Sequence, residues 1–197
     1  MPIRGITDSV QPGLPRIGKL RKGGEAPRNA AGQVVKMGED LDHFRFTSER
    51  PEVQAAFEDA YGATPALVHI YLPYADIERN FGCWKERGAA GGLVHRCDGE
   101  TMQIWLGPEG LYHKSPKPCD GDCDEVGRLS VIVPELVQAG YVGYVTLETH
   151  GINDLLSIQA SLLAAAESRA GNDLGLRGIQ WNLRRVKEKI STPMGNG

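Results

Sequence analysis

The stretch GGLVHRCDGETMQIWL, residues 91–106, has the pattern of a β-hairpin. Its two apolar arms flank Asp98-Gly99, a dipeptide that is favoured in tight two-residue turns. Side chains alternate along a strand, so His95 and Cys97 are predicted to point to the same face of the first arm. The hairpin therefore presents an imidazole and a thiol together, just before a long loop.

That loop, residues 107–127, is rich in glycine, proline, lysine and aspartate, and it carries further metal-binding residue types. Cys119 and Cys123 are separated by three residues, a spacing typical of structural zinc sites. Gly121 lies between them and gives the backbone the freedom to turn both sulfurs toward one ion. The remaining ligands of a tetrahedral site must come from elsewhere in the chain.

We expect a structural Zn²⁺ ion held by Cys97, His113, Cys119 and Cys123, with His95 as the alternative histidine. Thiolate and imidazole are ligands that suit zinc. The ion would clip the loop, which contains few large apolar groups, onto the fold. The alternative is a set of unrelated thiols and a surface histidine. Cys83, beside Trp84, is predicted to be a small core residue rather than a ligand.

Composition indicates a single soluble globular domain. The chain has 197 residues, of which 41% are hydrophobic and 24% charged. No run of apolar residues is long enough to span a membrane. No apolar leader follows Met1, which argues against secretion and favours the cytoplasm. In that reducing compartment, clustered thiols point to a metal before disulfides.

The apolar periodicity predicts an α+β fold with a mostly antiparallel sheet and two main helices. The main helices are expected at 49–61 and 152–168, with a short helix around 74–80. Besides the hairpin, strands are expected at 43–47, 67–72, 129–133, 142–147 and 178–184.

Charge divides the chain into segments. Residues 1–36 hold seven cations and two acids and are rich in glycine and proline. They are predicted to form an arm that either docks on an acidic partner or lies solvated over the domain. Residues 37–190 form the single domain, with the metal-binding loop 95–123, and residues 191–197 form a disordered tail.

Sequence motifs of common enzyme classes are missing: there is no GxSxG elbow, no Walker A loop and no GxGxxG turn. His150, Asp154 and Ser157 lie close in sequence, but their position indicates a helix N-terminus rather than a catalytic triad. A metal-dependent hydrolase would need an open coordination position and a carboxylate base. A zinc-containing nucleic-acid-binding module is a further alternative.

Several segments together resemble a known family. They are MPIRGITDSVQPGLPRIGKLRKGGE, HIYLP, GLVHRCDGE, PCDGDC running into GRLSVIVPEL, GYVTLETHGINDLLSIQASL and GIQWNLRRVKEKISTP. The chain resembles the phage-type recombination directionality factors that act with large serine integrases. This resemblance implies a non-enzymatic accessory protein in the cytoplasm of a bacterial host cell. Such a protein binds the integrase and biases site-specific recombination toward prophage excision. It meets DNA indirectly, through the recombinase complex.

Overall fold

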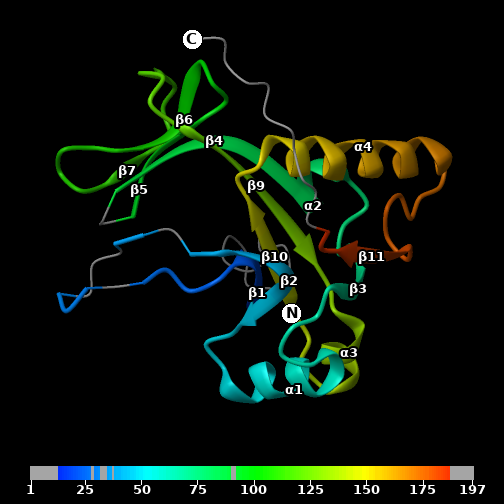
Figure 1. Cartoon of the computed structure of the whole chain (residues 1–197). Helices are drawn as coiled ribbons and strands as arrows, with labels where there is room; N and C mark the ends of the chain where they lie inside the picture. Colours follow the sequence, from blue (N-terminus) through cyan, green and yellow to red (C-terminus); the bar gives the residue numbers. More distant parts are fainter. Residues whose placement is uncertain (1–12, 28, 32–34, 37, 90–91, 187–197) are drawn as a thin grey trace, which may run out of the picture.

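The computed structural model describes residues 13–27, 29–31, 35–36, 38–89 and 92–186 (Figure 1). Residues 1–12 of the predicted arm and the predicted tail 191–197 lie outside this range. The described chain has an α+β fold with a mostly antiparallel sheet, which confirms the predicted fold class. Within this part of the chain, no helix is both long and apolar enough to cross a membrane.

A nine-stranded sheet forms the centre of the fold, in the order β2-β1-β10-β9-β4-β5-β6-β7, with β8 also paired to β6. Only the β1–β10 pair is parallel among these pairings. The strands are β1 (Arg16–Gly23), β2 (Asp40–Thr47), β4 (Phe81–Ala89), β5 (Gly92–Cys97), β6 (Thr101–Leu106), β7 (Tyr112–His113), β8 (Lys117–Pro118), β9 (Asp124–Val131) and β10 (Tyr144–Thr149).

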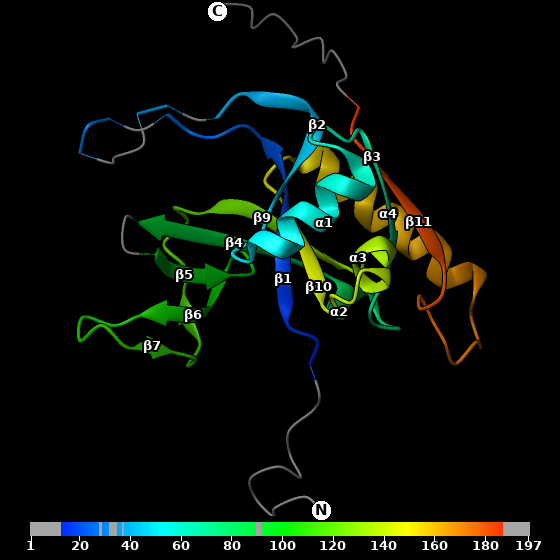
Figure 2. The same ribbon diagram turned by 90° about the horizontal axis from the view of Figure 1, so that it is seen from below.

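A two-stranded ribbon and the helices complete the hydrophobic core. The ribbon pairs β3 (Leu67–Tyr71) with β11 (Gln180–Arg184), and the helices are α1 (Pro51–Tyr61), α2 (Ile77–Asn80), α3 (Pro134–Gln138) and α4 (Ile152–Ser168) (Figure 2). Phe57 of α1 stacks on Phe46 of β2, with ring centroids 4.2 Å apart. The N-terminal end of α4 packs closely on β9, because a Cβ atom at Gly127 would lie 2.2 Å from Leu155.

Part of the predicted N-terminal arm is an inner strand of the sheet, next to the edge strand β2. Residues 16–23 form β1, which lies between β2 and β10. Leu20 is fully buried, and Gly18 lies so close to the Phe46 ring that any larger side chain would collide with it. Lys19 and Arg21 alternate with these core positions and point to the other face of the sheet. The seven cations of residues 1–36 obscure this alternation in the sequence.

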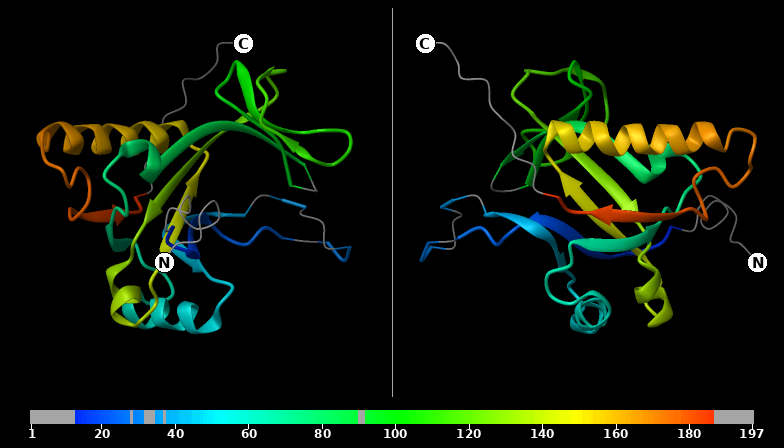
Figure 3. Two further views of the ribbon diagram at one scale, coloured as in Figure 1. Left: turned by 180° about the vertical axis from the view of Figure 1, so that it is seen from behind. Right: turned by 45° about the vertical axis from the view of Figure 1, so that its right-hand side comes forward.

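The hydrophobic core ends at Phe81 on β4 and at Leu129 on β9. Residues 82–128, which we call the wing, contribute no member to the main core cluster of the described chain. Figures 1 and 3 show the wing projecting away from α4. The prediction that Cys83 is a core residue is wrong: Cys83 is exposed, because it lies on β4 just beyond the edge of the core.

A buried ion-pair network holds one face of the wing. The Glu86 carboxylate, on a residue that is only 9% exposed, accepts bonds of 2.7 Å from both Nη atoms of Arg128 and one of 2.6 Å from Nε of Arg96. Burial alone would raise the pKa of Glu86, but these guanidinium bonds outweigh it and hold the pKa below its ordinary value. The network ties β4, β5 and β9 together.

We expect Glu86→Gln to destabilise the protein by about 2 kcal/mol at neutral pH, because the variant removes the charge that both arginines contact. Since the folded-state pKa of Glu86 is lowered, its contribution is present above the unfolded value of about 4.3 and is lost as the pH falls through the folded value. Urea unfolding should therefore show a difference from wild type that shrinks toward about pH 3. The exposed Glu49→Gln is the control, and an E86Q protein as stable as wild type at neutral pH would contradict the role.

Candidate metal centre

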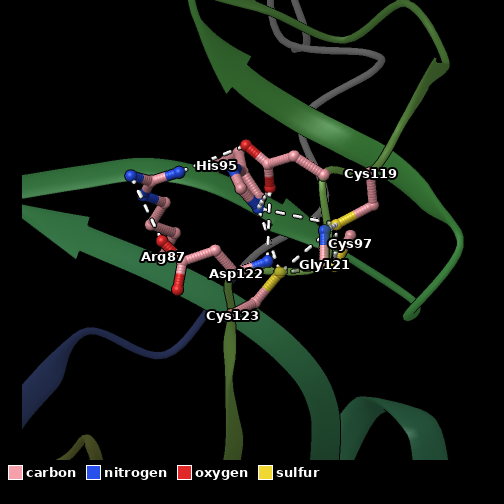
Figure 4. Close-up of polar contacts among 8 residues, drawn as sticks. Arg87, His95, Cys97, Cys119, Gly121, Asp122 and Cys123 are labelled. Carbon is pink, nitrogen blue, oxygen red and sulfur yellow. Dashed lines mark hydrogen bonds and ion pairs between the residues drawn. The ribbon is translucent and has the colours of Figure 1, made fainter.

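Four potential metal ligands come together on the wing: His95, Cys97, Cys119 and Cys123 (Figure 4). Their ligand atoms all lie within 4.8 Å of one another. The Sγ atom of Cys119 is 3.3 Å from that of Cys97 and 3.2 Å from that of Cys123. The Nε2 atom of His95 is 3.1 Å from the Sγ of Cys123 and 3.7 Å from that of Cys119.

The topology of the sheet explains why these side chains meet. His95 and Cys97 are two residues apart on β5, so they share one face of that strand. Cys119 follows β8, which pairs with β6, and Cys123 precedes β9, which pairs with β4. Because β5 and β4 lie between β6 and β9, the short segment 119–123 has to cross over them. The crossing brings two sulfurs onto the face where His95 and Cys97 already lie.

Two backbone features shape the crossing segment. The N–H of Cys119 donates to the carbonyl of Glu100 at 2.8 Å, which fixes the start of the segment to the turn of the hairpin. Gly121 has a φ of 84°, a left-handed conformation that suits glycine, and its N–H points at the Sγ of Cys119 at 3.4 Å. The glycine in the Cys-Asp-Gly-Asp-Cys turn is therefore required by the backbone.

When no cation is present, burial favours the protonated thiols of Cys97 and Cys123. Cys97 is fully buried and His95 is 2% exposed, while Cys119 and Cys123 are half-buried. Burial raises the pKa of Cys97 and raises that of Cys123 to about 12. The N–H of Gly121 lowers the pKa of Cys119. A divalent cation among the sulfurs would reverse this balance, because it stabilises thiolates.

The donor set fits a tetrahedral metal site better than a disulfide. All four cysteines are free, and the sulfur separations of 3.2 to 3.4 Å are well above an S–S bond. A tetrahedron with metal–sulfur bonds of about 2.3 Å has edges of about 3.8 Å, close to the separations seen. Four side chains can therefore surround one ion with small shifts.

Arg87 supports the crossing segment from β4. It pairs with His95 in the β4–β5 register, and its Nη1 and Nη2 atoms each lie 3.2 Å from a carboxylate oxygen of Asp120 and Asp122, respectively. Asp120 also lies 3.8 Å from the Nε2 atom of His95. The guanidinium thus offsets the charge of both aspartates in the Cys119–Cys123 turn and holds the turn over β5.

The structure places His113 outside the cluster. His113 lies on β7, its ring stacks on Trp105 with centroids 4.3 Å apart, and its Nε2 atom contacts the Glu109 carboxylate. His95, the alternative in the sequence analysis, lies with the three sulfurs instead. Strand alternation already placed His95 beside Cys97, whereas proximity in sequence to Cys119 suggested His113.

His150, Asp154 and Ser157, whose sequence positions were compared with a catalytic triad, do not form a hydrogen-bonded Ser-His-Asp chain in the described structure. His150 contacts the carbonyl of Glu125 at 3.1 Å and a carboxylate oxygen of Glu148 at 3.6 Å. Asp154 pairs with Lys22 and accepts a bond of 2.9 Å from Thr149. Asp154 lies in the first turn of α4, where a carboxylate favours the positive end of the helix.

Comparison with known proteins identifies the family. No curated protein and no solved structure matches the chain. Residues 17–196 match the family described as Gp3-like, recombination directionality factor-like. The match runs through the whole sheet and includes all four residues of the cluster. The chain therefore belongs to the Gp3-like family of recombination directionality factor-like proteins.

Proposed function

We propose that this protein is a non-catalytic accessory factor that binds a large serine integrase and biases recombination toward excision. The observation that carries the proposal is the family match over residues 17–196. The physical requirement is modest, because the factor needs only to bind one integrase conformation more tightly than another. A tenfold preference corresponds to about 1.4 kcal/mol.

An exposed apolar stripe on α4 supports a protein contact. Ile152, Leu156 and Leu163 are 58%, 64% and 45% exposed, although each is a large aliphatic side chain. Their spacing of four and seven residues places them on one side of the helix. Apolar side chains gathered on a surface mark protein interaction sites more often than singly scattered ones do.

We expect the protein to co-elute with its cognate integrase in size-exclusion chromatography at micromolar concentrations. Leu156→Gln should weaken this association about tenfold or more and reduce excision in a two-plasmid assay, because it places a polar group in the stripe. Leu111→Gln is the matched control, since Leu111 is equally exposed but lies on the wing. Absence of co-elution by the wild-type protein would contradict the proposed function, and equal losses in both variants would contradict the α4 contact.

We propose that the ion in the cluster is a structural Zn²⁺ held by Cys97, Cys119, Cys123 and His95. Zinc suits a set of three sulfurs and one imidazole, and it prefers four ligands. Four protein ligands would leave no open position for a hydrolytic water. The ion would supply to the wing the cohesion that the hydrophobic core does not provide.

The zinc content of variants should show whether His95 or His113 is the histidine ligand. The purified wild-type protein is expected to hold one equivalent of zinc by elemental analysis, and His113→Ala should keep it, whereas His95→Ala should lose most of it. Because H95A removes a buried ring, Arg87→Gln provides a second variant that keeps every ligand. Its zinc affinity should fall about 10-fold or more, since Arg87 holds the turn. Zinc-free wild type, or loss in H113A with retention in H95A, would contradict the assignment.

Chelation should loosen the wing and leave the core folded, because the core cluster contains no wing residue. Hydrogen exchange measured before and after treatment with a zinc chelator should show faster exchange in β5, β6 and the segment 119–123. Exchange in β1 and β10 should stay unchanged as an internal control. Uniform loss of protection over both regions would contradict a local role for the ion.

A further inference from the structure

The strand β11 has one side that no other strand of the described chain covers. β11 pairs with β3 alone (Figure 2). Just beyond this ladder, the N–H of Arg185 donates to the carbonyl of Ala66, the residue directly opposite, at 2.8 Å. Because hydrogen-bonded and non-hydrogen-bonded pairs alternate in an antiparallel ladder, Leu183 and Trp181 also bond to β3. The remaining residues of β11 point their backbone N–H and carbonyl groups away from β3: Gln180, Asn182 and Arg184.

The far edge of β3 shows the same alternation, but there the backbone groups are occupied. The N–H and carbonyl of Tyr71 bond to Ile132 at 2.9 and 2.8 Å. Those of His69 meet the hydroxyl group of Tyr61, at 3.1 and 3.4 Å. In the β3–β11 register, Tyr71 and His69 stand opposite two of the residues whose backbone groups point outward on β11. The ribbon is therefore closed on the β3 side and open on the β11 side.

The ends of the nine-stranded sheet are protected where β11 is not. At the outer edge of β2, the N–H of Phe44 donates to the carbonyl of Pro65 at 2.8 Å, and the carbonyl of Phe46 accepts a bond from Nε2 of Gln54 at 3.3 Å. At the other end of the sheet, β7 is only two residues long. Within the described residues, no hydrogen bond reaches the outward groups of β11. Such an unpaired row is a template for the addition of another strand.

The side chains of β11 are complementary to a second copy of the same strand. In an antiparallel pair centred on Asn182, Gln180 stands opposite Arg184 of the other copy, and Trp181 stands opposite Leu183. The polar pairs fall on the exposed face of the strand and the apolar pairs on its half-buried face. Registers that place Arg184 opposite itself would oppose like charges, which is unfavourable. The centred register avoids this and gives every outward backbone group a partner.

We propose that β11 pairs in this register with the β11 strand of a second copy, so that the protein is a twofold symmetric dimer. The two ribbons then form one four-stranded sheet in the order β3-β11-β11-β3. Its outer edges are those of β3, where Tyr61 and Ile132 already occupy the backbone groups. Pairing therefore ends at two copies and does not continue into a fibre. The inference rests on the ribbon alone and does not depend on integrase binding.

Sedimentation velocity of the full-length protein between about 5 and 500 µM tests this pairing. A reducing agent is required, because Cys83 is exposed and could link two copies. The shared ladder is short, which predicts a weak dimer with a Kd on the order of 10–100 µM. Asn182→Pro should weaken the dimer about tenfold or more, since it removes an N–H that points outward and no bond to β3. Asn182→Ala keeps that N–H and is the matched control, with an unchanged Kd.

Charge substitutions at Gln180 test the register. Gln180→Glu should tighten the dimer about threefold or more, because it places a carboxylate opposite Arg184 of the second copy. Gln180→Arg should weaken the dimer by a similar factor, because it opposes two guanidinium groups. Within one copy, residues 180 and 184 are about 13 Å apart along the strand, so neither change alters a contact between them. Unchanged thermal unfolding of all the variants verifies that the ribbon is intact.

The outcomes separate this inference from the proposed function. A dimer that responds in these directions to N182P, Q180E and Q180R, and not to N182A, would support the pairing. A monomer at every concentration, or a dimer that N182P leaves intact, would overturn it. Equal effects of Q180E and Q180R would overturn the register. A monomeric protein that co-elutes with the integrase, and loses this association in N182P, would uphold the proposed function and assign the β11 edge to a strand of the integrase instead.

Discussion

The cohesion of the wing without a hydrophobic core is the constraint on which the rest of this structure depends. The apolar cluster ends at Phe81 and Leu129, yet the sheet continues through four more strands. Two polar assemblies hold this extension, one on each face: the cluster of His95 with three cysteines, and the carboxylate of Glu86 with its arginines. The first joins β5 to the segment 119–123 that crosses it, and the second joins β4, β5 and β9, so both depend on the order in which the strands pair.

The two faces of the sheet are covered by different groups. The helices and the β3–β11 ribbon cover one face over the inner strands, and the segment 119–123 covers the same face over the outer ones. The opposite face carries Lys19 and Arg21 of β1, Arg45 of β2 and the Glu86–Arg128 pair of β4 and β9. The α4 stripe therefore lies on the side of the sheet opposite to Lys19, Arg21 and Arg45.

Local periodicity predicted the hairpin, both main helices and the strands around the core, because apolar residues there recur at regular spacing. β1 was missed, since Lys19 and Arg21 occupy the positions that face away from the core and give the segment a polar composition. β4 was missed because Lys85, Glu86 and Arg87 place charges on both of its faces beyond Phe81. The proximity of Cys97, Cys119 and Cys123 in the candidate metal centre was predictable from the sequence, whereas which of His95 and His113 lies beside them depends on how β5, β6 and β7 pair. Pairing order is a long-range property that spacing in the sequence does not encode.

Arginines on one sheet face can be sorted by whether a buried carboxylate lies within reach. Glu86 is nearly buried, so without Arg96 and Arg128 its charge would be desolvated and unpaired, which makes these arginines part of the fold. Arg21 has no such partner within the described chain and is exposed, so its removal would leave no buried charge behind. Arg21 stands opposite Arg45 in the β1–β2 register, and directly opposed like charges cost the fold stability.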